Sequence, residues 1–223
     1  MLKKLTDEKL SEILEAGISE FAEKGLGDTS MSTIARRAGI SVGVLYKYYE
    51  NKDDFWSACI RHCIAELDQF LRSLCAKEMK PLQYAEALIS SAQQFSRQHK
   101  DYIRLYFEAT RTADREQAAL LAREIEGMSA RLYTEIVQRA QAAGSVRRDL
   151  DPRLFAFFMD NLLMMMQFSY CCPYYQERFK LYGGEDVLED SELVPSQLLK
   201  FLESAFTLEQ ADIPHNTKTE VTK

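Results

Sequence analysis

Hydrophobic residues recur at steps of three and four along most of this chain, which is the spacing of an amphipathic α-helix. The first such stripe runs from Leu10 to Phe21 and predicts a helix over residues 7–24, with Thr6 as its N-cap. No strand-like alternation persists, and proline and glycine are few. The pattern therefore predicts an all-α protein.

Polar capping residues and one glycine divide the next segment into short helices. A serine or asparagine at an N-cap accepts a hydrogen bond from the first helical turn, and glycine adopts the left-handed conformation that ends a helix in a tight turn. The predicted caps are Ser30, Ser41 and Asn51, the glycine is Gly39, and the helices cover residues 31–38, 42–48 and 52–76.

Longer helical patterns follow, and they indicate two structured parts. We expect an N-terminal three-helix helix-turn-helix domain over residues 1–50, a larger helical ligand-binding and dimerisation domain over 51–209, and a flexible tail over 210–223. Proline at the first helical position and glycine after the last mark several boundaries. The predicted helices of the larger domain, after the one that starts at residue 52, cover 81–98, 101–112, 115–143, 152–181 and 195–209.

Net charge narrows the kind of partner this protein can bind. The 223 residues carry a net charge of −6 and the sequence pI is about 5.3, so the whole molecule is not a general binder of polyanions. The segment 30–52 is an exception with a local net charge of +3. Its basic residues are Arg36, Arg37, Lys47 and Lys52, and its acid is Glu50.

Two short helices joined by residues 38–41 form a helix-turn-helix, in which the second helix lies in the major groove of DNA. Leu45 and Tyr49 are four residues apart and are expected to anchor this second helix to the core. The outward positions are then Val42, Gly43, Tyr46 and Lys47. The basic segment with its tyrosines therefore favours contact with a double-stranded DNA operator.

Residues 10–56 resemble the DNA-binding domain of TetR-family transcriptional regulators. The resemblance is carried by FAEKG at 21–25, TSMSTIARRAGIS at 29–41 and VGVLYKYYENKDDF at 42–55, in family order and spacing. It implies a homodimer that binds a palindromic operator and is released by a small-molecule effector in its C-terminal domain. The predicted function is a ligand-responsive transcriptional regulator and repressor.

The resemblance also assigns roles to single residues of the N-terminal domain. It implies phosphate contacts from Ser30, Tyr46, Tyr48 and Lys52, and base-edge or groove contacts from Ser32, Thr33, Val42, Gly43 and Lys47. Ser41, the predicted cap of the reading helix, is counted among the DNA-binding residues.

The helices predicted over 152–181 and 195–209 are apolar on more than one face. Burial against a second copy of the chain in a two-fold four-helix interface satisfies such helices, although an ordinary monomer core is the alternative. Aromatic and methionine side chains can line an apolar cavity, and the same residues can be plain core. The candidate ligand-binding residues are Arg104, Tyr106, Phe107, Met165 and Phe168, for a small apolar or aromatic effector.

Five cysteines, odd in number and unevenly spread, fit a reducing cytoplasm better than a disulfide framework. Cys59, His62 and Cys63 lie within about one helical turn, and Cys171 adjoins Cys172, so a thiol- or metal-responsive regulator on the same scaffold is the alternative. We nevertheless expect no bound metal and no cofactor.

Other function classes find little support. Three histidines and no glycine-rich phosphate loop or nucleophile–base pair argue against an enzyme, and the motif at 29–55 argues against a carrier that never binds DNA. No uninterrupted apolar run approaches the roughly twenty residues of a membrane span, and the N-terminus lacks a secretion signal. We therefore expect no membrane partner and a cytoplasmic location.

Overall fold

The computed structural model describes residues 5–75, 79–111 and 115–207, and within these ranges the chain forms helices and no β-strand. The all-α prediction is confirmed. The elements in chain order are α1 (Asp7–Asp28), α2 (Met31–Arg37), α3 (Val42–Tyr48), α4 (Lys52–Cys75), α5 (Pro81–Gln98), α6 (Lys100–Ala109), α7 (Arg115–Ala142), α8 (Pro152–Cys171), α9 (Pro173–Gly183), the 3₁₀ turn η1 (Glu185–Leu188) and α10 (Leu193–Thr207). The tail predicted over 210–223 lies outside the described residues.

The helix-turn-helix forms where the caps predict it. The Oγ of Ser30 accepts a hydrogen bond from the N–H of Thr33 at 3.2 Å, and the Oγ of Ser41 accepts one from Val44 at 3.3 Å. Between the two helices, Gly39 adopts a left-handed φ of 67°. The predicted starts of α2 and α3 are therefore confirmed by the hydrogen bonds that create them.

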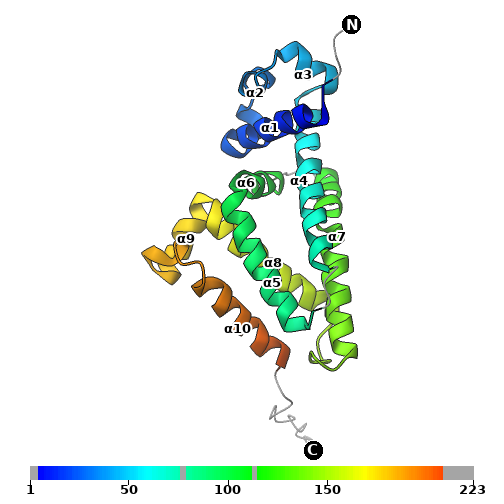
Figure 1. The fold of residues 1–223 in the computed structure, drawn as a ribbon, viewed down its shortest axis with the longest axis vertical. Helices are drawn as coiled ribbons and strands as arrows, with labels where there is room; N and C mark the ends of the chain where they lie inside the picture. The colour runs from blue at the N-terminus through cyan, green and yellow to red at the C-terminus, as the bar shows by residue number, and fades with distance from the viewer. Residues whose placement is uncertain (1–4, 76–78, 112–114, 208–223) are drawn as a thin grey trace, which may run out of the picture.

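The first of two hydrophobic cores holds α1–α3 together, and we call this end of the molecule the head (Figure 1). Its buried side chains do not stop at residue 50. The head core also contains the first half of α4 and three residues of α6, namely Phe55, Trp56, Cys59 and Ile60 with Tyr102, Leu105 and Ala109. Since α1 packs against both α4 and α6, the head is fixed to the rest of the chain by shared packing.

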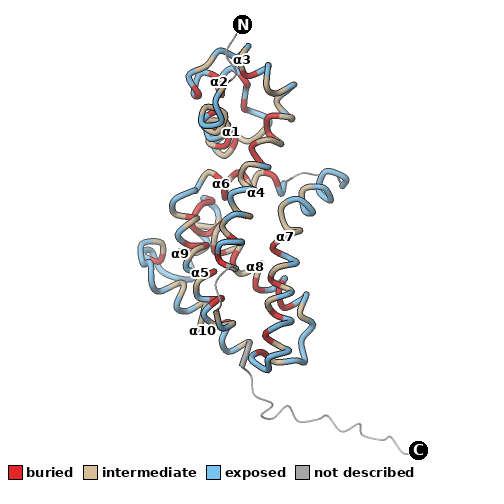
Figure 2. Tube along the Cα trace, turned by 45° about the vertical axis from the view of Figure 1, so that its right-hand side comes forward, coloured by how far each residue is buried: buried red, intermediate tan, exposed pale blue. Residues whose placement is uncertain are grey.

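The second core fills the larger part of the molecule, which we call the body. In the body, α8 packs against α5, α6, α7 and α9, while α10 lies along α5 (Figures 1 and 2). By length and composition α8 could also cross a membrane, which the sequence analysis did not anticipate. Half of its most apolar stretch is buried inside the fold, as in a core helix, so this is weak evidence for a span.

The single helix predicted over 152–181 is wrong, because the chain forms two helices there. Cys172 is extended, with φ −101° and ψ 128°, and Pro173 begins a new helix. A proline clashes with a helical conformation at the preceding residue, which explains the break. The second piece, α9, has no buried residue and leaves Tyr174, Leu181 and Tyr182 strongly exposed.

Candidate nucleic-acid interface and effector cavity

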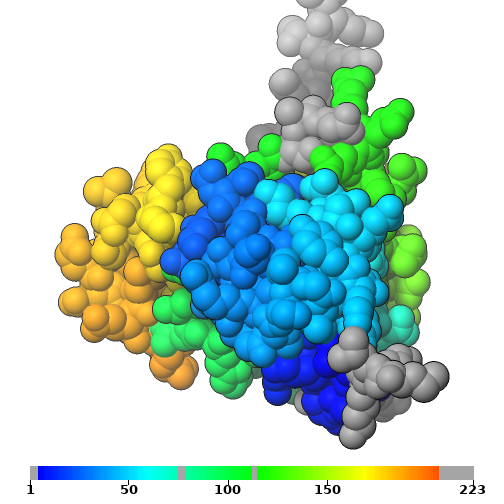
Figure 3. Space-filling model, turned by 90° about the horizontal axis from the view of Figure 1, so that it is seen from above, coloured from blue at the N-terminus to red at the C-terminus, as the bar shows by residue number. Residues whose placement is uncertain are grey.

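The recognition surface is the outward side of α3 at the end of the head. Leu45 is 1% exposed and holds α3 to the head core, and Tyr49 packs edge-on against Phe55 with ring centroids 4.7 Å apart. On the opposite side, Tyr46 is 51% exposed and Lys47 is exposed as well. Figure 3 looks onto this end of the molecule, where the head faces the viewer.

Gly43 lies in the first turn of α3, where a Cβ would meet no atom within 4 Å. Val42 beside it is 37% exposed, and Ser32 on α2 is exposed. The absence of a side chain at Gly43 leaves the backbone of α3 open to close approach by a ligand. The surface thus combines a bare backbone, a phenol and an ammonium group.

Two of the residues expected to contact DNA phosphates also form hydrogen bonds within the head. The Oη of Tyr48 accepts a hydrogen bond from the N–H of Leu5 at 2.8 Å, which leaves its own O–H able to donate. The Nζ of Lys52 donates to the carbonyl oxygens of Gly27 at 3.2 Å and Thr29 at 3.0 Å. Lys52 therefore ties α4 to the segment before α2, a role that the sequence did not reveal.

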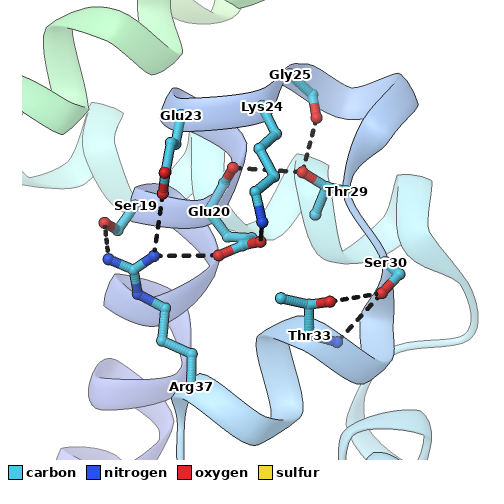
Figure 4. A network of polar contacts seen from close by, with 9 residues as sticks. All are labelled: Ser19, Glu20, Glu23, Lys24, Gly25, Thr29, Ser30, Thr33 and Arg37. Carbon is cyan, nitrogen blue, oxygen red and sulfur yellow. Dashed lines mark hydrogen bonds and ion pairs between the residues drawn. The ribbon is translucent and has the colours of Figure 1, made fainter.

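Arg37 is committed to a polar network between α1 and α2 (Figure 4). Its guanidinium donates to the Oγ of Ser19 at 2.6 Å and to Oε2 of Glu20 at 3.1 Å. Glu20 is 2% exposed, and a hydrogen bond from Lys24, with a further one from Arg37, holds the pKa of its carboxyl below the usual range despite burial. The positive charge of Arg37 is thus paired within the head.

The four basic residues of the segment 30–52 therefore divide into two pairs. Arg37 and Lys52 stabilise the head, whereas Arg36 and Lys47 are exposed and form no ion pair with another described residue. The exposed pair supplies the positive charge of the recognition surface. This charge is smaller than the count from sequence suggests.

A cavity of about 110 Å³ lies in the body among α4, α5, α6, α7 and α8. Its wall is mostly apolar, with aromatic rings from Phe70, Phe95, Tyr102, Tyr106 and Tyr133. An engineered cavity of roughly 150 Å³ is known to hold benzene, so the space suits a group about the size of one small ring. We call it the inner cavity.

A larger and more open groove of about 670 Å³ adjoins the inner cavity between α7 and α8. The residues common to both walls are Glu126, Ser129, Tyr133, Asp160 and Met164. A ligand at this junction could place an apolar part in the inner cavity and a polar part in the groove. This division between apolar and polar contacts is common in small-molecule sites.

The polar groups at the junction are acidic. The Oη of Tyr106 donates to Oε1 of Glu126 at 2.5 Å, and burial raises the pKa of the Tyr106 phenol. Burial, together with the negative charge of Glu126, raises the pKa of Asp160 to about 6. The Asp160 carboxylate is half-buried near a second acid and receives no hydrogen bond from another described residue.

We expect Asp160→Asn to stabilise the protein by about 1–2 kcal/mol at pH 7.5. The folded-state pKa of Asp160 lies above its unfolded value of 3.8, so its contribution to stability is fully present below pH 3.8 and is lost as the pH rises through 6. The amide cannot ionise and avoids this loss. Urea unfolding at pH 7.5 and pH 4 measures the effect, and equal stabilisation at both values would contradict it.

Of the five candidate ligand residues, Tyr106 lines the inner cavity and the other four do not. The Arg104 guanidinium donates to the carbonyl of Cys171 at 2.8 Å, and Phe107 packs edge-on against Phe168 at 5.3 Å. Sequence reasoning missed Glu126 and Asp160. Asp160 had a signal, because it is the only charged residue within the apolar run 154–168.

Of the cysteines whose side chains are described, Cys59, Cys171 and Cys172 are buried and Cys63 is partly buried. Burial raises the pKa of the Cys171 thiol to about 12 and that of Cys172 to about 11, and it also raises the pKa values of Cys59 and Cys63. Thiols in such surroundings form little of the reactive thiolate. No three acidic, histidine or cysteine side chains in the described ranges are grouped to hold a metal ion.

Comparison with known proteins identifies the head. Residues 13–59 match the sequence model of a family described as bacterial regulatory proteins, tetR family. The HTH-type transcriptional repressor KstR2 of Rhodococcus jostii is 24% identical over 152 residues, which is 68% of this chain and 74% of that protein. The match to the family covers the helices that form the recognition surface.

Two solved structures share the fold of the whole chain. The transcriptional regulator FadR from Bacillus subtilis, in complex with stearoyl-CoA, has a TM-score of 0.71 at 16% identity and covers 89% of this chain and 100% of its own. AibR, in complex with isovaleryl coenzyme A and operator DNA, has a TM-score of 0.65 at 18% identity and covers 89% and 97%.

The fold and the exposed recognition helix define a helix-turn-helix DNA-binding protein with a larger helical domain. Within that class, the family match over residues 13–59 and the similarity to KstR2 identify the head as that of a TetR-family transcriptional regulator. The expectation drawn from the motifs at 21–55 is thereby confirmed.

Proposed function

We propose that this protein is a repressor that leaves its operator when a small, mostly apolar effector fills the inner cavity. One observation carries the proposal, namely that α6 belongs both to the wall of the cavity and to the head core. A change of shape at the cavity therefore reaches the head without an intervening loop. The relatives named as transcriptional regulators support this class over an enzyme.

Tyr102 is one of the residues that belong both to the cavity wall and to the head core. Its ring lines the inner cavity, and its hydroxyl donates to a carboxylate oxygen of Glu15 on α1. His62 of α4 contacts the same carboxylate at 3.2 Å. An effector that displaces this ring would disturb the contact between α6 and α1, and it could shift the orientation of the head by as much as its affinities for the two states differ.

On the DNA, we assign base and groove contacts to the outward side of α3 and the start of α2, and phosphate contacts to the hydroxyls around them. The exposure of Tyr46 and Lys47 supports this assignment, as does the bare backbone at Gly43. The Nζ of Lys52 is occupied by two carbonyl groups, so we give Lys52 a supporting role beside the phosphate contacts. We place the protein in the cytoplasm, where the operator is.

A second copy of the chain would cover the exposed apolar side chains of the body. On α8, Leu154 is 56% and Phe158 is 58% exposed, and on α10 Phe201 is 59% exposed. Groups of large exposed apolar residues mark interfaces more often than free surface. A two-fold homodimer also matches the symmetry of a palindromic operator.

We expect the double variant Phe158→Glu/Phe201→Glu to be a monomer, because two charges per subunit would be buried without partners in the interface. Light scattering coupled to size exclusion measures the mass. The matched control is Leu120→Glu, which changes a 53% exposed leucine on α7. A dimeric double variant, or a monomeric control, would contradict the assignment of this face.

The experiment for the proposed function starts from DNA that the protein itself selects from a randomised duplex pool. Fluorescence anisotropy with the selected duplex at several salt concentrations should show specific, salt-dependent binding. Ligands that raise the melting temperature of the free protein should lower its affinity for this duplex. Selection of no sequence above background would overturn the proposal.

A further inference from the structure

The charged residues that line the inner cavity are both acids. Glu126 from α7 and Asp160 from α8 lie at the junction with the groove, and no lysine or arginine belongs to the wall of the inner cavity in the part of the chain that the structure describes. The neighbouring group from α6 is the hydroxyl of Tyr106, which donates to Glu126. Both charged groups in the wall of the inner cavity are therefore hydrogen-bond acceptors.

Among the described residues, two arginines line the adjoining groove. Arg131 and Arg153 line the groove and not the inner cavity, and the Arg153 guanidinium already pairs with Asp151 at 2.8 Å. Neither is among the groups that influence the titration of Asp160, whose electrostatic partner is Glu126. The two carboxylates thus line the inner cavity, whose wall contains no lysine or arginine among the described residues.

This arrangement discriminates between ligand charges. An anionic group placed at the junction would add a third negative charge in a poorly solvated place, where repulsion is strong. A neutral hydroxyl would satisfy one carboxylate at most. A primary ammonium brings a positive charge and three N–H donors, and it could bond both carboxylates at once.

We infer that the effector of this protein is a primary amine with a compact apolar or aromatic group, held with its ammonium between Glu126 and Asp160 and its apolar group in the inner cavity. The inference rests on the proposed function, since it names the class of ligand for the same site. The size of the cavity, about 110 Å³, sets the apolar group at about one ring.

Three probes of nearly equal size and different charge test the inference. They are 2-phenylethylamine, 2-phenylethanol and phenylacetate, which are cationic, neutral and anionic at neutral pH. We expect isothermal titration of the full-length protein at pH 7.5 to give an affinity for the amine at least about tenfold higher than for the alcohol, and no measurable binding of the acid.

Variants of the two acids test whether these residues cause the preference for the amine. Asp160→Asn and Glu126→Gln keep the shape of each side chain and remove its charge, so each should lower the affinity for the amine and leave that for the alcohol within about twofold. The matched control is Glu124→Gln, an exposed acid on the same helix that does not line the cavity. It should bind all three probes as the natural sequence does.

The outcomes separate the inference from the proposed function. Binding of phenylacetate or of the alcohol as tightly as the amine would overturn the inference and leave a ligand cavity in place. An amine preference that survives both acid variants would also overturn it. Binding of no probe, together with unchanged affinity for selected DNA, would count against the cavity as an effector site altogether.

Discussion

Replacing Tyr46 and Lys47 together with alanine is expected to lower affinity for selected operator DNA by about a hundredfold or more. Both side chains are exposed on the outward side of α3, and Lys47 forms no ion pair with another described residue. Their loss removes one phenol and one positive charge from each recognition helix, which is two of each in a dimer. Fluorescence anisotropy gives the affinity, and the salt slope should fall by about one ion per lost lysine contact.

The free protein should keep its stability, because surface substitutions change it by only about 0.5 kcal/mol. The control is Tyr182→Ala/Lys180→Ala on α9, which removes the same two residue types from the body, away from α3. Lys180 differs from Lys47 in that it pairs with Glu177 at 2.8 Å, but this control variant should still bind DNA as the natural sequence does. Equal affinities for the two double variants would mean that α3 does not enter the groove.

Gly17→Val is expected to destabilise the protein by about 3 kcal/mol or more. Gly17 is buried where α1 crosses α4, and a Cβ there would stand 2.4 Å from the ring of Phe55 and 2.9 Å from the Sγ of Cys59. Phe55 is fully buried and already contacts Phe21 and Tyr49, so its ring has nowhere to turn. Chemical denaturation measures the free energy of unfolding.

The control for crowding is Gly27→Ala on the same helix, where a Cβ meets no atom within 4 Å. This change should be neutral or stabilise by up to about 1 kcal/mol, since alanine restricts the unfolded chain. If both variants have the same stability, then close packing at Gly17 does not hold α1 to α4.

Local signals made the head predictable from sequence. Ser30, Ser41 and Asn51 set the starts of α2, α3 and α4 through hydrogen bonds within the next three residues. Such capping depends on neighbours in the sequence alone. The alternation of Leu45 and Tyr49 with outward residues follows from helical periodicity in the same way.

Long-range partners escaped the sequence analysis. The sequence alone suggests that Arg37 and Lys52 are free positive charges. In the fold, Arg37 pairs with Glu20, and Lys52 donates to the carbonyls of Gly27 and Thr29. The break before Pro173 was overlooked although a proline marks it, because the apolar pattern continues through it.

The cavity was the least predictable part. Its wall combines five helices, and aromatic residues on one helix are divided between the cavity and plain core, as Tyr106 and Phe107 are. Periodicity describes which side of a helix is apolar and not which neighbour that side meets. An acid in an apolar run, such as Asp160, is the better guide to a cavity, because burying an acid lowers stability and acids with shifted pKa values cluster at functional sites.

The contribution of α6 to the head core limits how this regulator can be taken apart. A fragment ending near residue 50 would expose Ile13, Ile18 and Phe21 to water, because the residues that cover them arrive from α4 and α6. Grafting the recognition helices onto another regulator would therefore require a recipient with matching side chains at the positions of Tyr102, Leu105 and Ala109. A chimera of two such proteins should fold only if α1 and the packing residues of α4 and α6 come from the same parent.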